Sequence, residues 1–136
     1  MKARAFLDLA REMAAGATEA HWRGTVGRAY YGLLLECRDT LLRWGFALPP
    51  RDKVHAVVRL RMVYSSDSDV KRIGFTLDHL GQLRNRADYD LKPSKYFASS
   101  VHAGHAVQDA ADALNLLDAL DGDPARRAAA ITSIRP

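Results

Sequence analysis

Two short segments of the chain hold the side chains best suited to chemistry. The first is Arg28-Ala29-Tyr30-Tyr31, and the second is the run RNRADYD from Arg84 to Asp90. Guanidinium groups bind phosphate or carboxylate through paired hydrogen bonds, and an amide such as that of Asn85 can orient them. These residue types indicate a site for a phosphate or a carboxylate.

Both segments also have structural explanations, which the sequence leaves open. Tyr30 falls on an apolar stripe, and a tyrosine buried in a helical bundle usually finds a partner for its hydroxyl. Arg28 can pair with Asp88 or Asp90, which would join the two segments inside the fold. The segment from Arg84 to Asp90 can equally be a solvated helix end held by ion pairs.

Other histidines give weaker signals. Arg72 and His79 satisfy an Arg-x6-His pattern, which a chain with fifteen arginines and five histidines produces easily by chance. His102 and His105 have the spacing of metal ligands on a helix, but no third acidic or cysteine ligand follows nearby. We therefore predict no metal site and no cofactor site.

Composition places the chain among ordinary globular proteins. Of its 136 residues, 48% are apolar and 26% are charged, which fits one domain. We expect this domain at residues 1–122, followed by a C-terminal tail or short helix at 123–136. The net charge of +4 is compatible with a nucleic-acid partner without requiring one.

The sequence predicts a soluble, cytoplasmic protein with no membrane partner. It has no apolar run of the ~18 residues that a membrane span needs. Asp8, Arg11 and Glu12 interrupt the first apolar segment, which excludes a secretory signal. The single cysteine, Cys37, excludes an internal disulfide and fits a reducing compartment.

Helical periodicity dominates the chain and gives the elements that must position these residues. Helices are expected at about residues 3–15, 19–44, 53–64, 70–89 and 94–120, with Ser94 capping the fifth. The second would bury a stripe of Val26, Tyr30, Leu33, Cys37, Leu41 and Trp44. We predict an all-α, four- to five-helix up-and-down bundle. Its functional segments would lie in the middle of the second helix and at the end of the fourth.

Three motifs in order resemble the HEPN family of helical domains. Arg28 to Tyr31 resembles its R-x-Y-Y element, and Arg84 to Asp90 resembles the R-x-x-A-D-Y-D ending of one branch. Between them, Lys53-Val54-His55 resembles the K-x-H that opens a short helix in that branch. The resemblance covers roughly residues 18–120.

The resemblance implies a HEPN-like bundle that is often a homodimer and often pairs with a minimal nucleotidyltransferase in toxin–antitoxin or defence systems. Active relatives are metal-independent ribonucleases with an R-x4-6-H motif that commonly begins R-N, and two copies of it meet at the dimer cleft. Arg84-Asn85 matches the start of this motif, and Tyr89 stands where its histidine would be. The implied catalytic positions are Arg84, Asn85 and Tyr89.

Tyr89 changes what this motif can do. A tyrosine with a pKa near ~10 is a poor base at pH 7. Asp88 and Asp90 would act as bases only if the pKa of one were raised, and neighbouring arginines lower it instead. Cleavage of RNA is left open, and binding of RNA or nucleotide phosphates through Arg84 and Arg86 is the expected function.

In this hypothesis the remaining residues serve the same site. Arg28 would be a further phosphate ligand, and Asn85 would orient phosphate or an arginine. Asp88 and Asp90 would fix the guanidinium groups. The supporting groups would be Tyr30, Tyr31 and His55. The alternative is a non-catalytic interaction module that dimerises and docks a partner nucleotidyltransferase. There, the segment from Arg84 to Asp90 would be a structural lock.

Overall fold

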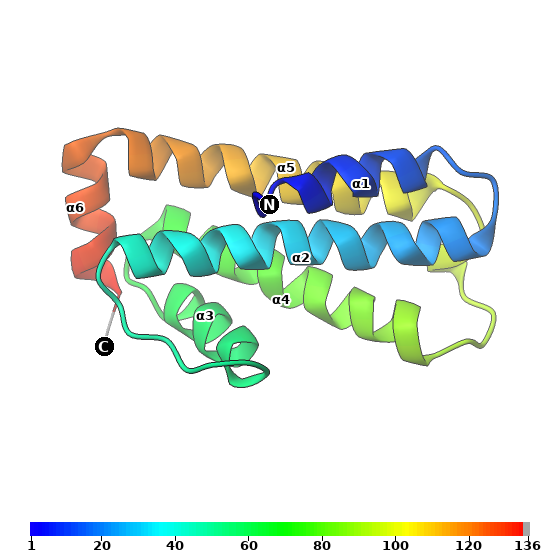
Figure 1. Cartoon of the computed structure of the whole chain (residues 1–136), viewed down its shortest axis with the longest axis horizontal. Coiled ribbons are helices and arrows are strands. Elements are labelled where there is room, and N and C mark those ends of the chain that lie inside the picture. Colours follow the sequence, from blue (N-terminus) through cyan, green and yellow to red (C-terminus); the bar gives the residue numbers. More distant parts are fainter. Residues whose placement is uncertain (135–136) are drawn as a thin grey trace.

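The computed structural model describes residues 1–134 and is all-α, as predicted, with no strand in that range. Figure 1 shows the order of its elements. They are α1 (Ala5–Ala14), α2 (Glu19–Arg43), α3 (Lys53–Val63), α4 (Ser68–Tyr89), the 3-10 helix η1 (Lys95–Phe97), α5 (Val101–Gly122) and α6 (Pro124–Ser133).

Four of these helices, α1, α2, α4 and α5, form an up-and-down bundle. Figure 1 shows α1 and α4 running antiparallel to α2, whereas α5 runs parallel to it. The long helix α2 contacts α1, α4 and α5. Helix α3 lies in the connection between α2 and α4 and packs on α4. This arrangement brings α2, α3 and α4 together on one side of the molecule.

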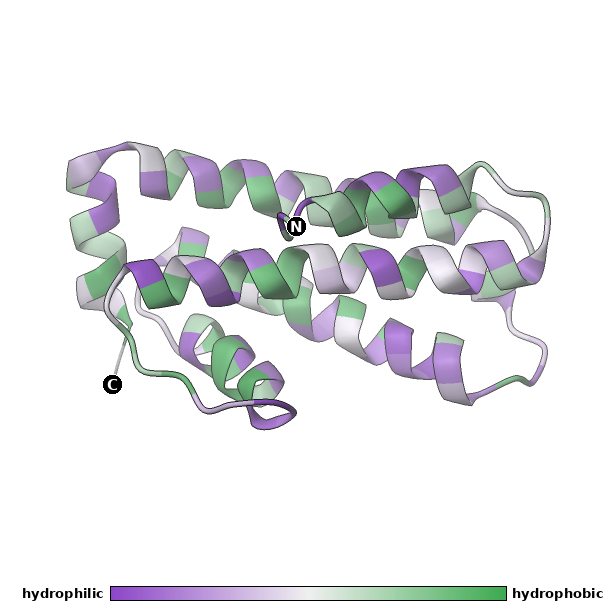
Figure 2. Ribbon diagram, in the orientation of Figure 1, coloured by the Kyte–Doolittle hydropathy of each residue, from purple (hydrophilic) through white to green (hydrophobic). Residues whose placement is uncertain are grey.

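One core runs through the bundle. Figure 2 shows apolar and polar residues alternating along the helices, and among the apolar ones Leu33, Leu77 and Leu117 are at most 1% exposed. Burial of such a leucine side chain contributes about 1.5–3 kcal/mol. Cys37 is fully buried among them, and this burial raises the pKa of its thiol.

Helix α6 joins the same core at one end of the bundle. Ala130 and Ile134 belong to the core cluster, and the hydroxyls of Ser65 and Ser133 lie 2.6 Å apart. Of the C-terminal segment predicted at 123–136, residues 124–133 form this helix, whereas residues 135 and 136 lie outside the described residues. No helix within residues 1–134 has the length and apolar character of a membrane span.

Two helix starts differ from the sequence prediction. Helix α4 begins at Ser68, because the Asp67 carboxylate accepts hydrogen bonds from the backbone N–H groups of Asp69 and Val70 at 2.9 and 3.1 Å. The prediction that Ser94 caps the fifth helix is wrong. Its hydroxyl accepts a hydrogen bond from the Tyr96 N–H at 3.2 Å and so caps η1.

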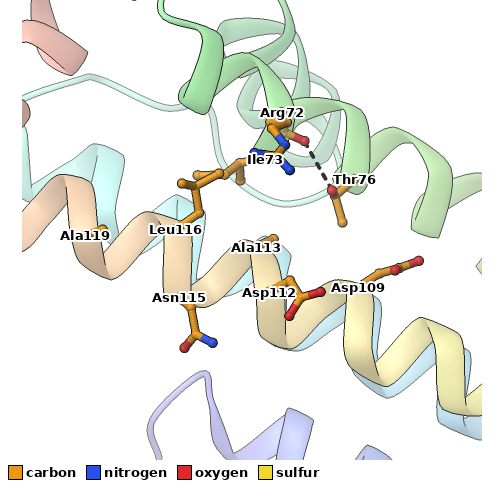
Figure 3. Close-up of a pocket in the computed structure, with 9 residues that line it drawn as sticks. All are labelled: Arg72, Ile73, Thr76, Asp109, Asp112, Ala113, Asn115, Leu116 and Ala119. Atoms are coloured by element: carbon orange, nitrogen blue, oxygen red, sulfur yellow. Dashed lines mark hydrogen bonds between the residues drawn. The ribbon is translucent and has the colours of Figure 1, made fainter.

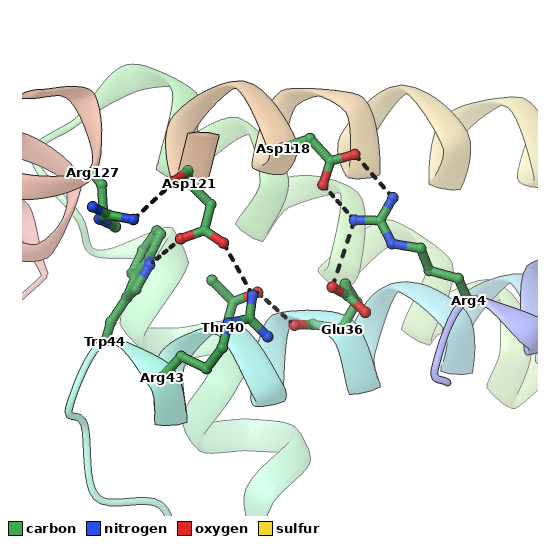
Figure 4. A network of polar contacts seen from close by, with 8 residues as sticks. All are labelled: Arg4, Glu36, Thr40, Arg43, Trp44, Asp118, Asp121 and Arg127. Atoms are coloured by element: carbon green, nitrogen blue, oxygen red, sulfur yellow. Dashed lines mark hydrogen bonds and ion pairs between the residues drawn. The ribbon is translucent and has the colours of Figure 1, made fainter. Parts of the chain in front are cut away.

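Polar side chains tie the outer helices together along one edge of the bundle (Figure 4). Arg4, immediately before α1, donates a 2.9 Å hydrogen bond to Asp118 of α5 and lies 3.5 Å from Glu36 of α2. At the far end of α2, the Trp44 indole N–H donates to Asp121 of α5 at 2.8 Å. These contacts fix α5 relative to α1 and α2.

Candidate functional site

Helices α2 and α4 cross so that the two motif segments meet. The Arg84 guanidinium on α4 donates a 2.9 Å hydrogen bond to the Tyr31 hydroxyl on α2 and lies 5.3 Å from the centre of that ring. Of the two glycines at this crossing, Gly81 favours the close approach, whereas the space at Gly27 would accept a methyl group. A Cβ atom at Gly27 would lie 4.0 Å from Cγ of Arg84, and one at Gly81 would lie 3.3 Å from the Tyr30 ring.

Helix α3 adds His55 to this group. Its Nδ1 lies 3.1 Å from the Tyr30 hydroxyl, and its ring packs edge-on against Tyr31 with 5.8 Å between the ring centres. Burial lowers the pKa of His55, and the positive charge of Arg84 lowers it further. The imidazole is therefore neutral at pH 7. Burial raises the pKa of Tyr30, against the opposing effect of Arg84.

The hydrogen bond between Tyr30 and His55 fits either tautomer of the neutral imidazole. With its proton on Nδ1, His55 donates to the Tyr30 hydroxyl, and Nε2 is a free base. With its proton on Nε2, the imidazole accepts from Tyr30 and can donate to an oxyanion. His55 therefore has a basic and a hydrogen-bonding role available to it.

Residues of the same helix complete the surroundings of Arg84. Asp88, four residues on, lies 3.0 Å from Nε of Arg84, and the Asn85 amide oxygen lies 3.4 Å from Nη1. The exposed Tyr89 ring is centred 5.8 Å from the guanidinium carbon. The Arg84 side chain is 20% exposed. The guanidinium thus lies near two phenol rings and remains accessible to an anion.

Arg28 precedes Tyr31 by one turn of α2, but it forms no hydrogen bond, ion pair or ring contact with the cluster around Arg84 in the described range. It is one turn from both Gly24 and Gly32, and those glycines pack against Met13 and Leu7 of α1. The predicted pairing of Arg28 with Asp88 or Asp90 is wrong: Arg28 forms no ion pair with any residue in the described range, and Asp88 pairs with Arg84. Arg28 therefore belongs to the α1-facing side of α2.

Arg86 also points away from Arg84. Two residues apart on a helix, the side chains project about 200° from one another. The Arg86 guanidinium lies 5.4 Å from the centre of the Tyr96 ring, near the start of α5. The two arginines therefore do not converge on one phosphate. The Asp90 carboxylate does not fix the Arg84 guanidinium either, because it accepts from the Lys92 backbone N–H at 3.2 Å.

The structural lock between α2 and α4 is Arg23, a residue that none of the sequence motifs indicated. Its side chain is buried, stacks 4.4 Å from the centre of the Phe97 ring and lies 3.6 Å from Glu19. Its guanidinium donates to four backbone carbonyls at the end of α4, those of Arg86, Ala87, Asp90 and Lys92. A signal existed: Arg23 lies seven residues before Tyr30 and so extends the buried stripe.

The remaining histidines lie apart from the Arg84 group. His102 and His105 have ring centres 5.7 Å apart and line a cavity between α4 and α5 together with His79. Arg72, the partner of His79 in the Arg-x6-His pattern, lines an adjoining cavity. Within residues 1–134, no three His, Cys, Asp or Glu side chains are grouped as metal ligands.

The chain matches no protein-family model, no curated protein and no solved structure. Its function is therefore inferred from its motifs and from the geometry around Arg84.

Proposed function

We propose that this chain is a HEPN-type protein of a toxin–antitoxin or defence system, and that it binds RNA or nucleotide phosphates at Arg84. One observation supports this most directly. Side chains from all three motifs, namely Tyr30 and Tyr31, His55, and Arg84, lie in one cluster. A guanidinium fork binds phosphate, and adjacent phenol rings offer surfaces on which bases stack.

Replacement of Arg84 tests this proposal. Arg84→Met should weaken binding of a fluorescent single-stranded RNA by about tenfold or more, because one phosphate contact and one cation–π surface are lost. Its effect on stability should be small, about 1 kcal/mol, since within residues 1–134 Arg84 forms a single hydrogen bond to another helix, that to Tyr31. Arg38→Met, which removes an arginine paired with its neighbour Asp39, is the matched control.

The alternative, a non-catalytic module that docks a nucleotidyltransferase, predicts the opposite effects of Arg84→Met on RNA binding and on stability. In that case Arg84→Met would leave RNA binding at the level of the control and would lower the melting temperature strongly. A fluorescence anisotropy titration beside a thermal melt of each variant separates the two functions.

A second candidate function, RNA cleavage without a metal, is favoured by the neutral His55 beside Tyr30 and Arg84. A neutral imidazole can accept the 2′-hydroxyl proton while the 2′ oxygen bonds to the adjacent phosphorus. The bond from phosphorus to the 5′ oxygen breaks, and that oxygen takes a proton from water. The products are a 2′,3′-cyclic phosphate and a 5′-hydroxyl, and Arg84 stabilises the intervening negative charge.

The test of cleavage is incubation of RNA with the protein in EDTA, with mass spectrometry of the products. His55→Gln should slow cleavage by about 100-fold, because it removes the proton-transfer group, and should leave RNA binding intact. His21→Gln removes a histidine outside this cluster and is the control. Absence of cyclic phosphate products from the wild-type protein would leave phosphate binding as the function.

The proposal includes two protein partners and a cytoplasmic location. The family resemblance supports a homodimer and a minimal nucleotidyltransferase antitoxin, and the single buried cysteine fits a reducing compartment. Light scattering of the purified chain tests the dimer. Growth arrest on expression of this chain, relieved by the nucleotidyltransferase encoded beside it, tests the pairing.

A further inference from the structure

A groove along α4 consists of three adjoining cavities, of which two lie between α4 and α5 and the third lies between α4 and η1. The first has a volume of about 470 Å³, and Figure 3 shows Arg72 and Thr76 of α4 facing Asp109 and Asp112 of α5 across it. The second, of about 310 Å³, shares Asp109 with the first. The third, of about 90 Å³, adjoins the second and reaches Arg86. The groove thus leads from an acidic part to the end of α4.

The end of the groove near Arg86 gathers cations around one aromatic ring. The Arg86 guanidinium and the Lys95 amine each lie 5.4 Å from the centre of the Tyr96 ring. His102 packs edge-on against the same ring at 4.9 Å, and His105 follows one turn along α5. Two cations and the His102 imidazole therefore lie against Tyr96, with the His105 imidazole next to His102.

These cations lack acidic partners. Within residues 1–134, Arg86 and Lys95 form no ion pair, whereas Arg84 of the same helix is paired with Asp88. The smallest cavity, which Arg86 lines, has no acidic residue in its wall. Asp109 lies at the junction with the first cavity. The local charge near Arg86 is therefore positive and uncompensated.

The backbone favours an anion at the same place. The carbonyl end of α4 carries partial negative charge, but the buried Arg23 guanidinium donates to two carbonyls of its last turn and to two of the segment that follows the helix. The neighbouring helix α5 begins at Val101, so its positive dipole end lies beside His102 and His105. Both effects raise the positive potential of the cavity.

We propose that two adjoining cavities, one lined by Arg86 and Tyr96 and the other by Tyr96, His102 and His105, together form a second phosphate-binding site, separate from Arg84, for a nucleotide that is either free or part of an RNA strand. Arg86 supplies the guanidinium fork, and each imidazole supplies an N–H donor in either tautomer. Leu83 and Ala106 form an apolar floor for the sugar or base. The histidine-lined cavity, whose volume is about 310 Å³ and whose one acidic wall residue is Asp109, lies within the size range of small-molecule sites.

NMR of the histidine imidazoles tests this site directly on the full chain. Inorganic phosphate, 5′-AMP and a short single-stranded RNA are titrated in separate experiments. Saturable shifts of the His102 and His105 signals are expected, with the His21 signals unmoved. Saturation by 5′-AMP indicates a free nucleotide, whereas saturation by RNA alone indicates a strand. Absence of saturable shifts with all three probes would overturn the site.

A double variant, Arg86→Gln with Lys95→Gln, should weaken this binding by about tenfold or more. Lys2→Gln with Arg11→Gln removes the same charge elsewhere and should bind as the wild type does. Undiminished binding by the first variant would also overturn the site. Arg84→Met should retain the His102 shift with 5′-AMP, so failure of the Arg84 proposal and failure of this second site are distinguishable.

Discussion

Arg23 of α2 and Asp90 at the end of α4 are joined by a 2.7 Å hydrogen bond from guanidinium to backbone carbonyl. Helix geometry leaves the last carbonyls of any α-helix without intrahelical partners. At the end of α4, the buried Arg23 side chain donates to one such carbonyl, that of Ala87, to the Arg86 carbonyl and to two carbonyls of the segment that follows the helix, and the Phe97 ring covers the other face of its guanidinium. This contact fixes the end of α4, from which Arg84 and Arg86 project on different sides.

Replacement of Arg23 should therefore destabilise the protein severely. Arg23→Met is expected to lower the free energy of unfolding by about 3 kcal/mol or more, because several part-buried carbonyls lose their donor. Urea denaturation at pH 7 measures this. Arg28→Met, on the same helix, should change stability by only about 0.5 kcal/mol, since Arg28 forms no ion pair or hydrogen bond within the described range. Equal effects of the two variants would contradict the role of Arg23 as the lock.

Two helical glycines should respond oppositely to alanine. At Gly74 of α4, a Cβ atom would lie 2.6 Å from the backbone nitrogen of Val63, so Gly74→Ala must separate α3 from α4. The expected cost is about 1–3 kcal/mol. At Gly104 of α5 nothing lies within 4 Å of the added atom, so Gly104→Ala should stabilise by about 0.5–1 kcal/mol through helix propensity. Thermal melts of both variants test the packing of α3 on α4.

His55 should make stability depend on pH between neutrality and mild acid. Its pKa is lowered in the folded protein by burial and by Arg84, so the unfolded chain binds the proton more readily. The free energy of unfolding should therefore fall as the pH drops below the ordinary histidine value of about 6.5, until the folded pKa is reached.

The variant His55→Gln should reduce this slope, because the amide does not titrate. Denaturation midpoints at a series of pH values between about 8 and 5 measure it. The comparison His21→Gln removes a histidine outside the cluster and is the control for loss of a titratable side chain. If the slopes of the wild type and His55→Gln coincide, His55 does not titrate differently in the folded state.

Asp67 should stabilise α4 in a manner that is lost in acid. Hydrogen bonds from Arg126, and then from the backbone N–H groups of Val70 and Asp69, lower its pKa against the opposing effect of burial. This contribution is present above the ordinary carboxyl pKa of about 4 and disappears as the pH falls through the lower folded value. Asp67→Ala should cost about 1 kcal/mol at pH 7 by loss of the N-cap.

The matched variant Asp67→Asn should retain most of that stability, because the amide oxygen still accepts from the N–H of Val70. The Asp67→Asn variant should lack the part of the stability that is lost in acid, because its amide does not titrate. Circular dichroism melts at pH 7 and at about pH 3 compare the three proteins. A cost of Asp67→Asn at pH 7 equal to that of Asp67→Ala would assign the effect to charge rather than to capping.

The helices were predictable because their apolar residues repeat at helical spacing and polar residues mark their ends. The stripe from Val26 to Trp44 is buried throughout, and Gly45 follows α2 with a φ of 95°, a conformation that favours glycine. The start of α5 was predicted wrongly because Ser94 caps whichever helix follows it. Periodicity could not show that a 3-10 turn, which buries Phe97, comes first.

The candidate site was predictable only in part. Tyr31 and Arg84 meet as the motif order suggested, but the separation of Arg84 from Arg86 follows from the direction in which α4 presents each face. The place of His55 depends on residues 44–52, which have no periodic pattern and include Arg51 at a φ of 58°. The sequence of such a connection does not predict where the following helix, α3, packs on the bundle.

The reactivity of the Cys37 thiol can be used to measure transient opening of the core around α2. The thiol is the only one in the chain, it is fully buried in α2, and burial keeps it protonated. A maleimide or iodoacetamide reagent can therefore attack it only when the α2 core separates. The rate of alkylation, measured by mass spectrometry of the intact protein, reports how often the core opens and needs no engineered label. It also measures how far a bound nucleotide suppresses these openings.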